Sequence, residues 1–255
     1  MIAKWWFAGL FCAAIGSAQP SHQLGIAHVA FRVADLESAR SFYQRLGFEQ
    51  FFEMKQGERT TEAFLKINDR QFIELYPRSD PSQSLGLMHV CYESNDLEAL
   101  HAGYVQRGLT VSDVRKAGAG NLLMTMKDPE GQTIEFTQYM PGSLHYEDRG
   151  KHLNVKCVSQ MLIGATTTAH DVVAVRAFYI DKLGFREVAG SALRMPGDSR
   201  QELDTGTSGI QFGASDLKQT AGVLSGLGLQ VRSSPTTVTV SDPDGNVISF
   251  LKWKD

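Results

Sequence analysis

Two histidines and two glutamates stand at matching distances along the chain. His28 precedes Glu74 by 46 residues, and His89 precedes Glu135 by the same distance. Each of the four lies inside a short, largely apolar run of the kind that forms a strand. A buried carboxylate without a partner is costly, and a divalent cation relieves that cost. The pattern therefore predicts one divalent metal site with four ligands: His28, Glu74, His89 and Glu135.

The strands that carry these ligands also indicate which other side chains share the cleft. Because side chains alternate between the two faces of a strand, residues two or four positions from a ligand lie on its face. We expect four such residues to line the cleft: Arg32, Phe72, Tyr76 and Cys91. The intervening residues of the first strand are expected to face a helix: Ala27, Val29, Phe31 and Val33.

A four-fold repeat runs along the chain. Each copy reads as an apolar strand, an Asp, an amphipathic helix and a Gly, with Asp-to-Gly spacings of 12, 12, 13 and 12 residues. The Asp can accept hydrogen bonds from the first helical turn, and the Gly can adopt the left-handed cap. The four pairs are Asp35 and Gly47, Asp96 and Gly108, Asp171 and Gly184, and Asp216 and Gly228. Such regular spacing indicates duplication of one unit.

Further strand-like runs follow the helices, so each unit is predicted to be a βαβββ module. We expect an α+β fold in which four modules pair into two domains, 24–139 and 155–255. Residues 140–154 are polar, contain Pro and Gly, and are predicted to be the linker. The helix-opening aspartates of the first two units are 61 residues apart and those of the last two only 45, so the third module is predicted to be shortened.

Residues 1–18 have the layout of a secretory signal peptide. Lys4 is followed by an apolar run, residues 5–15, and then by small residues up to Ala18. We therefore expect cleavage after Ala18 and export as a periplasmic or secreted protein. Cys91 and Cys157 would then be the only cysteines, and two buried thiols are favoured over a disulfide framework.

Composition excludes several classes of partner. The formal net charge is −3 and no basic run or aromatic-basic stripe is present, which argues against nucleic acid. No stretch reaches the roughly 18 to 20 apolar residues that stable membrane insertion requires. A small-molecule substrate is the partner that a buried metal site favours, and the sequence gives no indication of oligomeric state.

The paired modules, the early-strand histidines and the closing I-E-[LF] strand after DPEG resemble the vicinal oxygen chelate superfamily. This superfamily includes glyoxalase I, bleomycin-resistance proteins and extradiol dioxygenases. The resemblance covers about residues 24–252 and is best in the first half. Four ligands of the His-Glu-His-Glu type are similar to those of bacterial-type glyoxalase I.

The resemblance implies an isomerase or lyase of the glyoxalase type. Such an enzyme abstracts a proton next to a carbonyl, and its divalent ion stabilises the enediolate that forms. The resemblance assigns the base to Glu135, with Glu74 as the symmetric alternative. We expect one ion per chain, with Zn or Ni favoured by intrinsic affinity and Mn, Co or Fe compatible with the ligands.

Two other functions remain open. An extradiol-type Fe(II) dioxygenase needs two histidines and one carboxylate, but the tyrosine expected about ten residues before Glu135 is Thr125 here. A non-catalytic binding protein of the bleomycin-resistance type would have no use for four ligands. Export also makes a glutathione-dependent substrate an awkward fit, so the substrate is predicted only as a small oxygenated molecule.

The second half of the chain lacks the ligand pattern. Gly164 and Gly209 stand where the histidines are expected, and Ser249 stands where Glu135 is matched. The segment QELDTG, residues 201–206, is short and polar, so we expect no Glu-bearing closing strand in the third module. The C-terminal domain is accordingly predicted to hold no metal.

Overall fold

The computed structural model describes residues 22–188, 192–195 and 199–253. The predicted signal peptide, residues 1–18, lies outside the described residues. Among the helices of the described part, none is both long enough and apolar enough to cross a bilayer.

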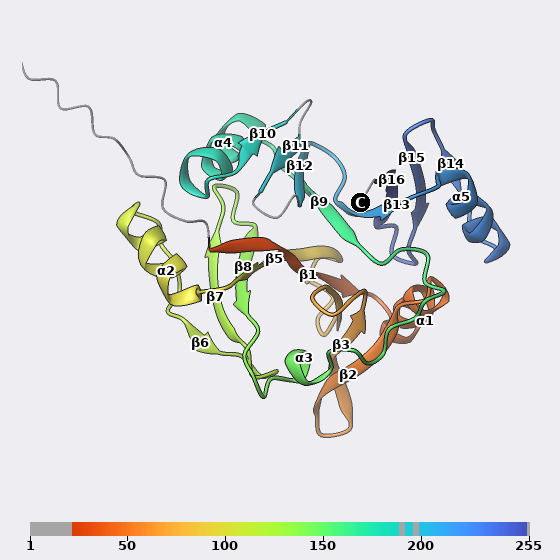
Figure 1. Ribbon diagram of the computed structural model, residues 1–255, viewed down its shortest axis with the longest axis horizontal. Helices are drawn as coiled ribbons and strands as arrows, with labels where there is room; N and C mark the ends of the chain where they lie inside the picture. Colours follow the sequence, from red (N-terminus) through yellow and green to blue (C-terminus); the bar gives the residue numbers. More distant parts are fainter. Residues whose placement is uncertain (1–21, 189–191, 196–198, 254–255) are drawn as a thin grey trace, which may run out of the picture.

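The first half of the chain folds into one curled sheet of eight strands, in the order β2-β3-β4-β1-β5-β8-β7-β6 (Figure 1). Its strands are β1 (Gln23–Val33), β2 (Glu49–Gln56), β3 (Arg59–Lys66), β4 (Phe72–Pro77), β5 (Gly86–Ser94), β6 (Arg115–Lys116), β7 (Leu122–Lys127) and β8 (Thr133–Gln138). Its helices are α1 (Leu36–Arg45) and α2 (Leu97–Gln106).

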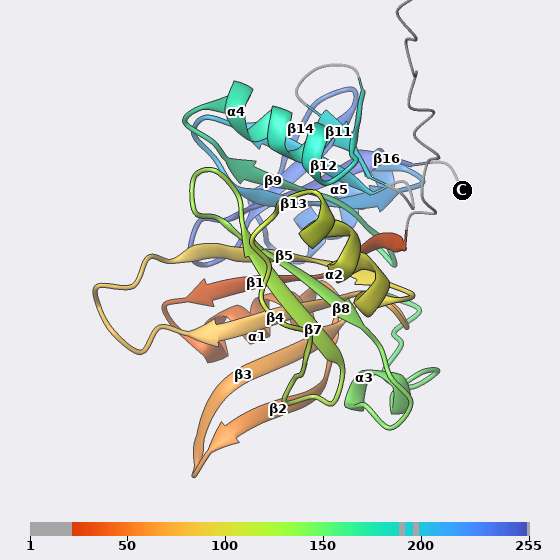
Figure 2. The same cartoon turned by 90° about the vertical axis from the view of Figure 1, so that its left-hand side faces the viewer.

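The second half repeats this arrangement in the order β10-β11-β12-β9-β13-β16-β15-β14. Its strands are β9 (Leu162–Thr168), β10 (Arg186–Glu187), β11 (Ala192–Arg194), β12 (Arg200–Asp204), β13 (Gly209–Ala214), β14 (Arg232–Ser233), β15 (Thr237–Ser241) and β16 (Val247–Lys252). Its helices are α4 (Val172–Ala177), which continues into a π-helical turn at Phe178–Lys182, and α5 (Leu217–Gly226). Figure 2 shows the second sheet stacked beside the first.

In each sheet the two modules meet through the first strands of their repeats. β1 pairs antiparallel with β5, and each has a parallel partner on its other side, β4 and β8 respectively. β9 and β13 pair in the same way between β12 and β16. The prediction of an α+β fold with four modules in two pairs is therefore confirmed. The third module is indeed shortened, because β10 and β11 have only two and three residues.

The repeated aspartates and glycines define the helix ends as expected. The carboxylates of Asp35, Asp96, Asp171 and Asp216 each accept a hydrogen bond from a backbone N–H in the first turn of the following helix. The four glycines that follow these helices all have positive φ, between 73° and 95°. The repeat is therefore a repeat of helix capping as well as of hydrophobic pattern.

A large apolar core fills the space between the helices and the outer face of each sheet. Val29, Phe31 and Val33 of β1 belong to this core together with Phe42 and Tyr43 of α1. Their predicted orientation toward a helix is confirmed. The opposite, concave face of the sheet is thereby left available for polar side chains.

Ala27 departs from the predicted alternation. The pairing of β1 with β5 has an irregularity between Ile26 and His28, so one extra residue is inserted there. Ala27 consequently packs with Phe72 and Cys91 instead of facing the helix. The prediction for Ala27 is wrong because a β-bulge shifts the alternation by one residue, directly beside His28.

The segment predicted as a linker contains a short helix, α3 (Leu144–Glu147), and it packs closely on the first sheet. The buried Lys66 ammonium donates to the backbone oxygens of Asp148 and Lys151, at 2.6 and 2.7 Å, and pairs with the Asp148 carboxylate at 2.9 Å. A buried ammonium requires such partners. Lys66 therefore fixes the end of α3 against the sheet.

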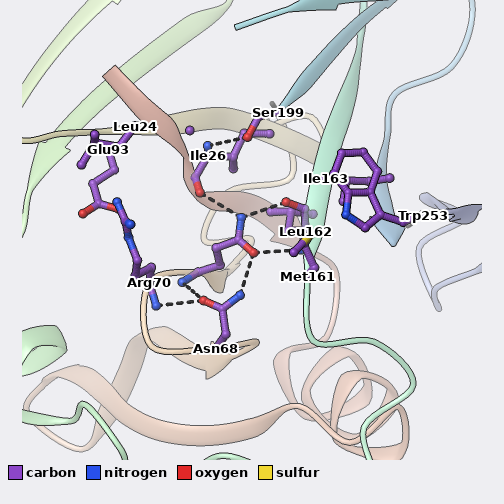
Figure 3. Close-up of a pocket in the computed structure, with 12 residues that line it drawn as sticks. Leu24, Ile26, Asn68, Arg70, Glu93, Met161, Leu162, Ile163, Ser199 and Trp253 are labelled. Atoms are coloured by element: carbon purple, nitrogen blue, oxygen red, sulfur yellow. Dashed lines mark hydrogen bonds and ion pairs between the residues drawn. The ribbon is translucent and has the colours of Figure 1, made fainter. Parts of the chain in front are cut away.

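Polar side chains join the two domains. The Gln71 amide donates to the backbone oxygens of Ile26 and Leu162 and accepts from the N–H of Leu162. Figure 3 shows Ile26, Asn68 and Leu162 gathered here beside a cavity of about 200 Å³. The two sheets are therefore held together by specific hydrogen bonds as well as by apolar packing.

Candidate metal centre

The four predicted ligands come from the four central strands of the first sheet. His28 is on β1, Glu74 on β4, His89 on β5 and Glu135 on β8. Glu74 and His89 are both register partners of Ala30, and Glu135 is the register partner of Cys91, which itself pairs with His28. Pairing of the first two modules thus brings residues that are up to 107 positions apart in the sequence onto one concave face.

The side-chain atoms of these residues converge. His28 Nε2 lies 3.2 Å from His89 Nε2, 3.2 Å from a Glu135 oxygen and 3.4 Å from a Glu74 oxygen. His89 Nε2 lies 3.9 Å from an oxygen of each glutamate. Both imidazole Nε2 atoms therefore lie within 3.9 Å of a Glu74 oxygen and of a Glu135 oxygen, and the two histidines face different oxygens of Glu135.

This donor set fits a divalent ion. Metal–ligand bonds of about 2.1 Å place neighbouring donors about 3.0 to 3.4 Å apart, close to the separations around His28. His28, Glu74 and His89 form one group that could hold an ion. All three are buried, where uncompensated carboxylates would be costly. The structure thus brings together every residue that the sequence predicted as a ligand.

The two glutamates have different electrostatic environments. Burial raises the pKa of Glu74 well above its usual 4.5, and the negative charges of Glu62 and Glu135 add to the rise. Burial also acts to raise the pKa of Glu135, but the hydrogen bond from His28 and the proximity of His89 outweigh it and lower the pKa. Without metal, Glu74 therefore favours its neutral form and Glu135 its ionised form.

His89 is suited to act as a neutral ligand. Burial lowers the pKa of His89 to about 4, although the charge of Glu135 opposes the shift. A metal-binding imidazole must have a free nitrogen lone pair. His89 therefore offers its nitrogen at neutral pH without first losing a proton.

Tyr76, predicted to line the cleft, contacts a ligand directly. Its hydroxyl donates to Glu74 at 3.1 Å and also makes a very short hydrogen bond with Glu62 of β3. Burial raises the pKa of Glu62, and the hydrogen bond with Tyr76 opposes that rise. Sequence analysis did not predict Glu62 as a site residue, because its strand carries no histidine. Its position, two residues before Phe64 in an apolar run, was the available signal.

The other predicted lining residues differ in their positions. Cys91 is buried, and His28, Cys91 and Glu135 form a second group that could hold an ion. Phe72 is fully buried beside Cys91. The Arg32 guanidinium donates to the backbone oxygen of Ser84, in an exposed hydrogen bond of 3.2 Å. Cys91 and Cys157 are both free thiols.

His145 of α3 is a buried residue that the sequence did not indicate. Its Nδ1 lies 2.8 Å from the Asn121 amide nitrogen, whereas its Nε2 has no hydrogen-bond partner among the described residues. The ring stacks on Tyr139 and meets Phe72 edge-on. Burial lowers the pKa of His145 to about 3, and the nearby His28 and Lys66 add to the effect. The surrounding sequence lacks any periodicity that would have revealed a buried histidine.

The second sheet shows what occupies the equivalent positions. Register relates Gly164 to His28, Gly209 to His89 and Ser249 to Glu135, as predicted. The expectation that the third module lacks a Glu-bearing closing strand is wrong. β12 pairs parallel with β9 and carries Glu202 opposite Thr166, in the place of Glu74. Pairing with β9 stabilises this strand despite its polar sequence.

Comparisons with solved structures extend over nearly the whole chain. The 2,3-dioxygenase LapB from Pseudomonas sp. KL28 is 16% identical with a TM-score of 0.71, covering 92% of this chain and 93% of that one. The Mn(II)-bound glyoxalase from Novosphingobium aromaticivorans is 14% identical with a TM-score of 0.71, covering 91% and 82%. An extradiol ring-cleaving dioxygenase from B. fuscum is 17% identical with a TM-score of 0.67, covering 91% and 72%. At these identities the likeness concerns the fold.

Sequence comparison finds a family model that matches the first half of the chain. A search of curated proteins found no match. The family model described as Glyoxalase/Bleomycin resistance protein/Dioxygenase superfamily matches residues 25–136, the part of the chain that builds the first sheet and contains all four converging ligands. The match to this superfamily therefore concerns the N-terminal domain, which resembles it in sequence over residues 25–136.

Proposed function

We propose that this protein is a metal-dependent enzyme of the glyoxalase type, which removes a proton next to a carbonyl of a small oxygenated substrate. The observation that carries the proposal is the convergence of His28, His89, Glu74 and Glu135 on one small volume. One divalent ion per chain would be held by these four residues. When bound, such an ion supplies electrostatic stabilisation to an enediolate.

Glu135 is the base in this proposal. Its lowered pKa keeps it ionised at neutral pH, so it is able to accept a proton. Its side chain is 13% exposed against 6% for Glu74, which places it nearer to an entering molecule. Glu74 is held by Tyr76 and has a raised pKa, which suits a fixed ligand better than a proton acceptor.

The ligands favour later divalent metals. Mixed nitrogen and oxygen donors bind Zn or Ni more tightly than Mn or Fe when availability is equal. The structurally similar Novosphingobium aromaticivorans glyoxalase is Mn(II)-bound, which keeps Mn among the candidates together with Co and Fe. The sulfur of Cys91, close to His28 and Glu135, would further favour a softer ion such as Zn.

An extradiol-type dioxygenase is the second candidate. His28, Glu74 and His89 alone make a two-histidine, one-carboxylate set, which is the arrangement that non-haem Fe(II) oxygenases use. LapB and the B. fuscum enzyme, both dioxygenases, share the fold. The presence of a second carboxylate at the same centre, Glu135, favours the glyoxalase type. A non-catalytic binding protein would not require four convergent ligands.

The decisive experiment combines metal content with two reactions. The purified chain is analysed for bound metals and reconstituted with Zn, Ni, Mn or Fe(II). Exchange of the carbon-bound hydrogens of dihydroxyacetone with D₂O is followed by NMR, and oxygen uptake with catechol is followed in parallel. Metal-dependent exchange without oxygen uptake supports the glyoxalase type. Oxygen uptake that occurs only in the Fe(II)-loaded protein would favour the dioxygenase over the glyoxalase type. Failure to bind any metal would overturn both proposed activities.

Export is part of the proposal. The charged, apolar and small-residue order of residues 1–18 supports cleavage after Ala18 and function outside the cytosol. Expression in a bacterium followed by fractionation and mass measurement of the intact chain tests this. A chain that retains Met1 in the cytosolic fraction would remove export and leave the metal centre unaffected.

A further inference from the structure

The second sheet has its own cleft at the position that corresponds to the metal centre. A cavity of about 270 Å³ opens on its concave face. Its lining includes Glu202, Gly209 and Ser249, which occupy the places of Glu74, His89 and Glu135. Duplication has therefore preserved the cleft and one glutamate, while the other three ligand positions changed.

This cleft is not built for a metal ion. A Cβ at Gly209 would lie 2.4 Å from the backbone oxygen of Val247. The position of Gly209 therefore has no room for a histidine side chain. Gln211 partly fills the space on the other side, since its Oε1 lies 2.7 Å from the position of a Cβ at Gly164. Glu202 is paired with Arg200 at 2.8 Å. The carboxylate is therefore already compensated without a cation.

Gln211 is held in one orientation by its neighbours. Its Nε2 donates to Thr166 at 3.1 Å and to Glu202 at 2.5 Å. A flipped amide would bring its oxygen against the Glu202 carboxylate, so the observed orientation is fixed. Gln211 is only 3% exposed and its Oε1 has no hydrogen-bond partner among the described residues. This oxygen lies against Gly164, which does not line the cavity, so the carboxylates of Glu202 and Asp204 are the acceptors that a ligand can reach.

The charged groups around the cavity are acceptors only, and its hydroxyls can both donate and accept. Asp204 carries a second carboxylate at the edge, and the hydroxyls of Ser249, Thr207 and Thr237 contribute oxygen atoms. Among the described residues that line the cavity, none is a lysine or an arginine. A ligand that pairs with the Glu202 and Asp204 carboxylates must therefore bring hydrogen-bond donors or a positive charge.

We propose that the cavity binds a small molecule rich in hydrogen-bond donors, with clustered hydroxyl or ammonium groups, independently of metal. The volume is below the usual range for drug-sized ligands and suits a molecule of about ten heavy atoms. Hydroxyls can donate to Ser249 and to the two carboxylates, and an ammonium group can pair with Glu202 and Asp204. This site is distinct from the proposed metal centre and does not depend on it.

The test is a ¹H–¹⁵N NMR titration of the full chain in the presence of EDTA with three probes. Glucosamine carries hydroxyls and an ammonium group, glucose only hydroxyls, and cyclohexylamine only an ammonium group. We expect saturable shifts of the Gly209, Gln211 and Ser249 amides with glucosamine. Equal affinity for glucose assigns recognition to hydroxyls, whereas equal affinity for cyclohexylamine assigns it to the cation.

Variants separate specific binding from general effects of the probes. Ser249→Leu, which fills the cavity, is expected to weaken glucosamine binding about tenfold or more, a change of about 1.4 kcal/mol. Ser241→Leu, at an exposed position of β15 that does not line the cavity, is expected to leave binding unchanged. Thr207→Trp at the exposed edge blocks entry without disturbing the core, and it replaces Ser249→Leu if that variant unfolds.

Two results would overturn binding at this cavity. If none of the three probes produces saturable shifts at these amides, the cavity does not bind donor-rich molecules. If the shifts persist in Ser249→Leu or Thr207→Trp, the probes bind elsewhere. Because the readout contains no metal and no turnover, neither outcome bears on the proposed metal-dependent activity.

Discussion

The two domains have the same strand order, the same helix caps and opposite chemistry on their concave faces. In the first sheet, His28 and His89 meet Glu74 and Glu135, whereas the second sheet has glycines and a serine at three of these four positions. The difference shows that fold and site are encoded by separate residues. Caps and outward-facing apolar residues specify the fold, and inward-facing residues are free to change.

Glu202, in the place of Glu74, is the one ligand-type residue that both domains retain. In the first domain Glu74 meets two imidazoles, but Glu202 meets Arg200 and Gln211. The same carboxylate position is thus compensated by a guanidinium and an amide where no imidazoles are present. A carboxylate in a strand is therefore a weak sign of a metal site until its partners are known.

Loss of a histidine should have the largest effect. We expect His28→Ala and His89→Ala to lower metal affinity by at least about 100-fold, because each removes a direct ligand whose partners remain buried. Elemental analysis after gel filtration measures this. Glu202→Gln in the second domain is the matched control and should retain one ion per chain. Retained metal in both histidine variants would show that the centre lies elsewhere.

The two glutamates of the first domain should separate binding from catalysis. Glu135→Gln is expected to lower kcat by about 10²- to 10⁴-fold, the usual contribution of a general base, with a smaller loss of metal. Glu74→Gln is expected to lose metal first and activity as a consequence. Metal titration and kinetics on the same preparations measure both effects. A wild-type rate in metal-loaded Glu135→Gln would contradict its role as the base.

Metal uptake should depend on pH because Glu74 must ionise to bind. Its raised pKa means that an entering ion displaces a proton, so affinity should rise about tenfold per pH unit until that pKa is passed. His89, whose pKa is lowered to about 4, adds proton competition only in more acidic solution. Calorimetry in buffers of different ionisation enthalpy counts the released protons. Uptake without proton release at pH 6 would indicate that Glu74 is already ionised.

Much of this fold and its ligands could be predicted from residue spacing. The equal distances from His to Glu and from Asp to Gly are visible because strands and helices have fixed periods. The features that were missed depend on contacts that spacing does not encode. A bulge turned Ala27 inward, pairing with β9 made a strand of a polar segment, and packing on aromatic rings buried His145. Glu62 approaches Glu74 only through Tyr76.

The buried Glu74 carboxyl should destabilise the metal-free folded protein at neutral pH. Because its folded pKa lies above 4.5, the folded state holds a proton that the unfolded state releases, so stability falls as pH rises from 4.5 toward that pKa. Glu74→Gln should therefore stabilise the metal-free protein at neutral pH by about 1 to 3 kcal/mol, although it weakens metal binding. Urea unfolding with EDTA at pH 4.5 and 7 measures the effect, which should shrink at the lower pH.

The smallest expected effects are those on the helix caps, where the two domains should behave alike. Asp35 accepts from the N–H of Ser38, and Asp216 accepts from those of Lys218 and Gln219. Replacing either Asp with Ala leaves these N–H groups to water and should cost about 0.5 to 2 kcal/mol. Because Asp216 caps two N–H groups and Asp35 one, Asp216→Ala should be the more destabilising.

Metal content should be unchanged in both variants, since neither cap contacts the centre. Urea unfolding followed by circular dichroism measures the stabilities, and elemental analysis measures the metal. Loss of metal in Asp35→Ala alone would show that the first domain couples its framework to its site, and the separation between fold and chemistry would then hold only for the second.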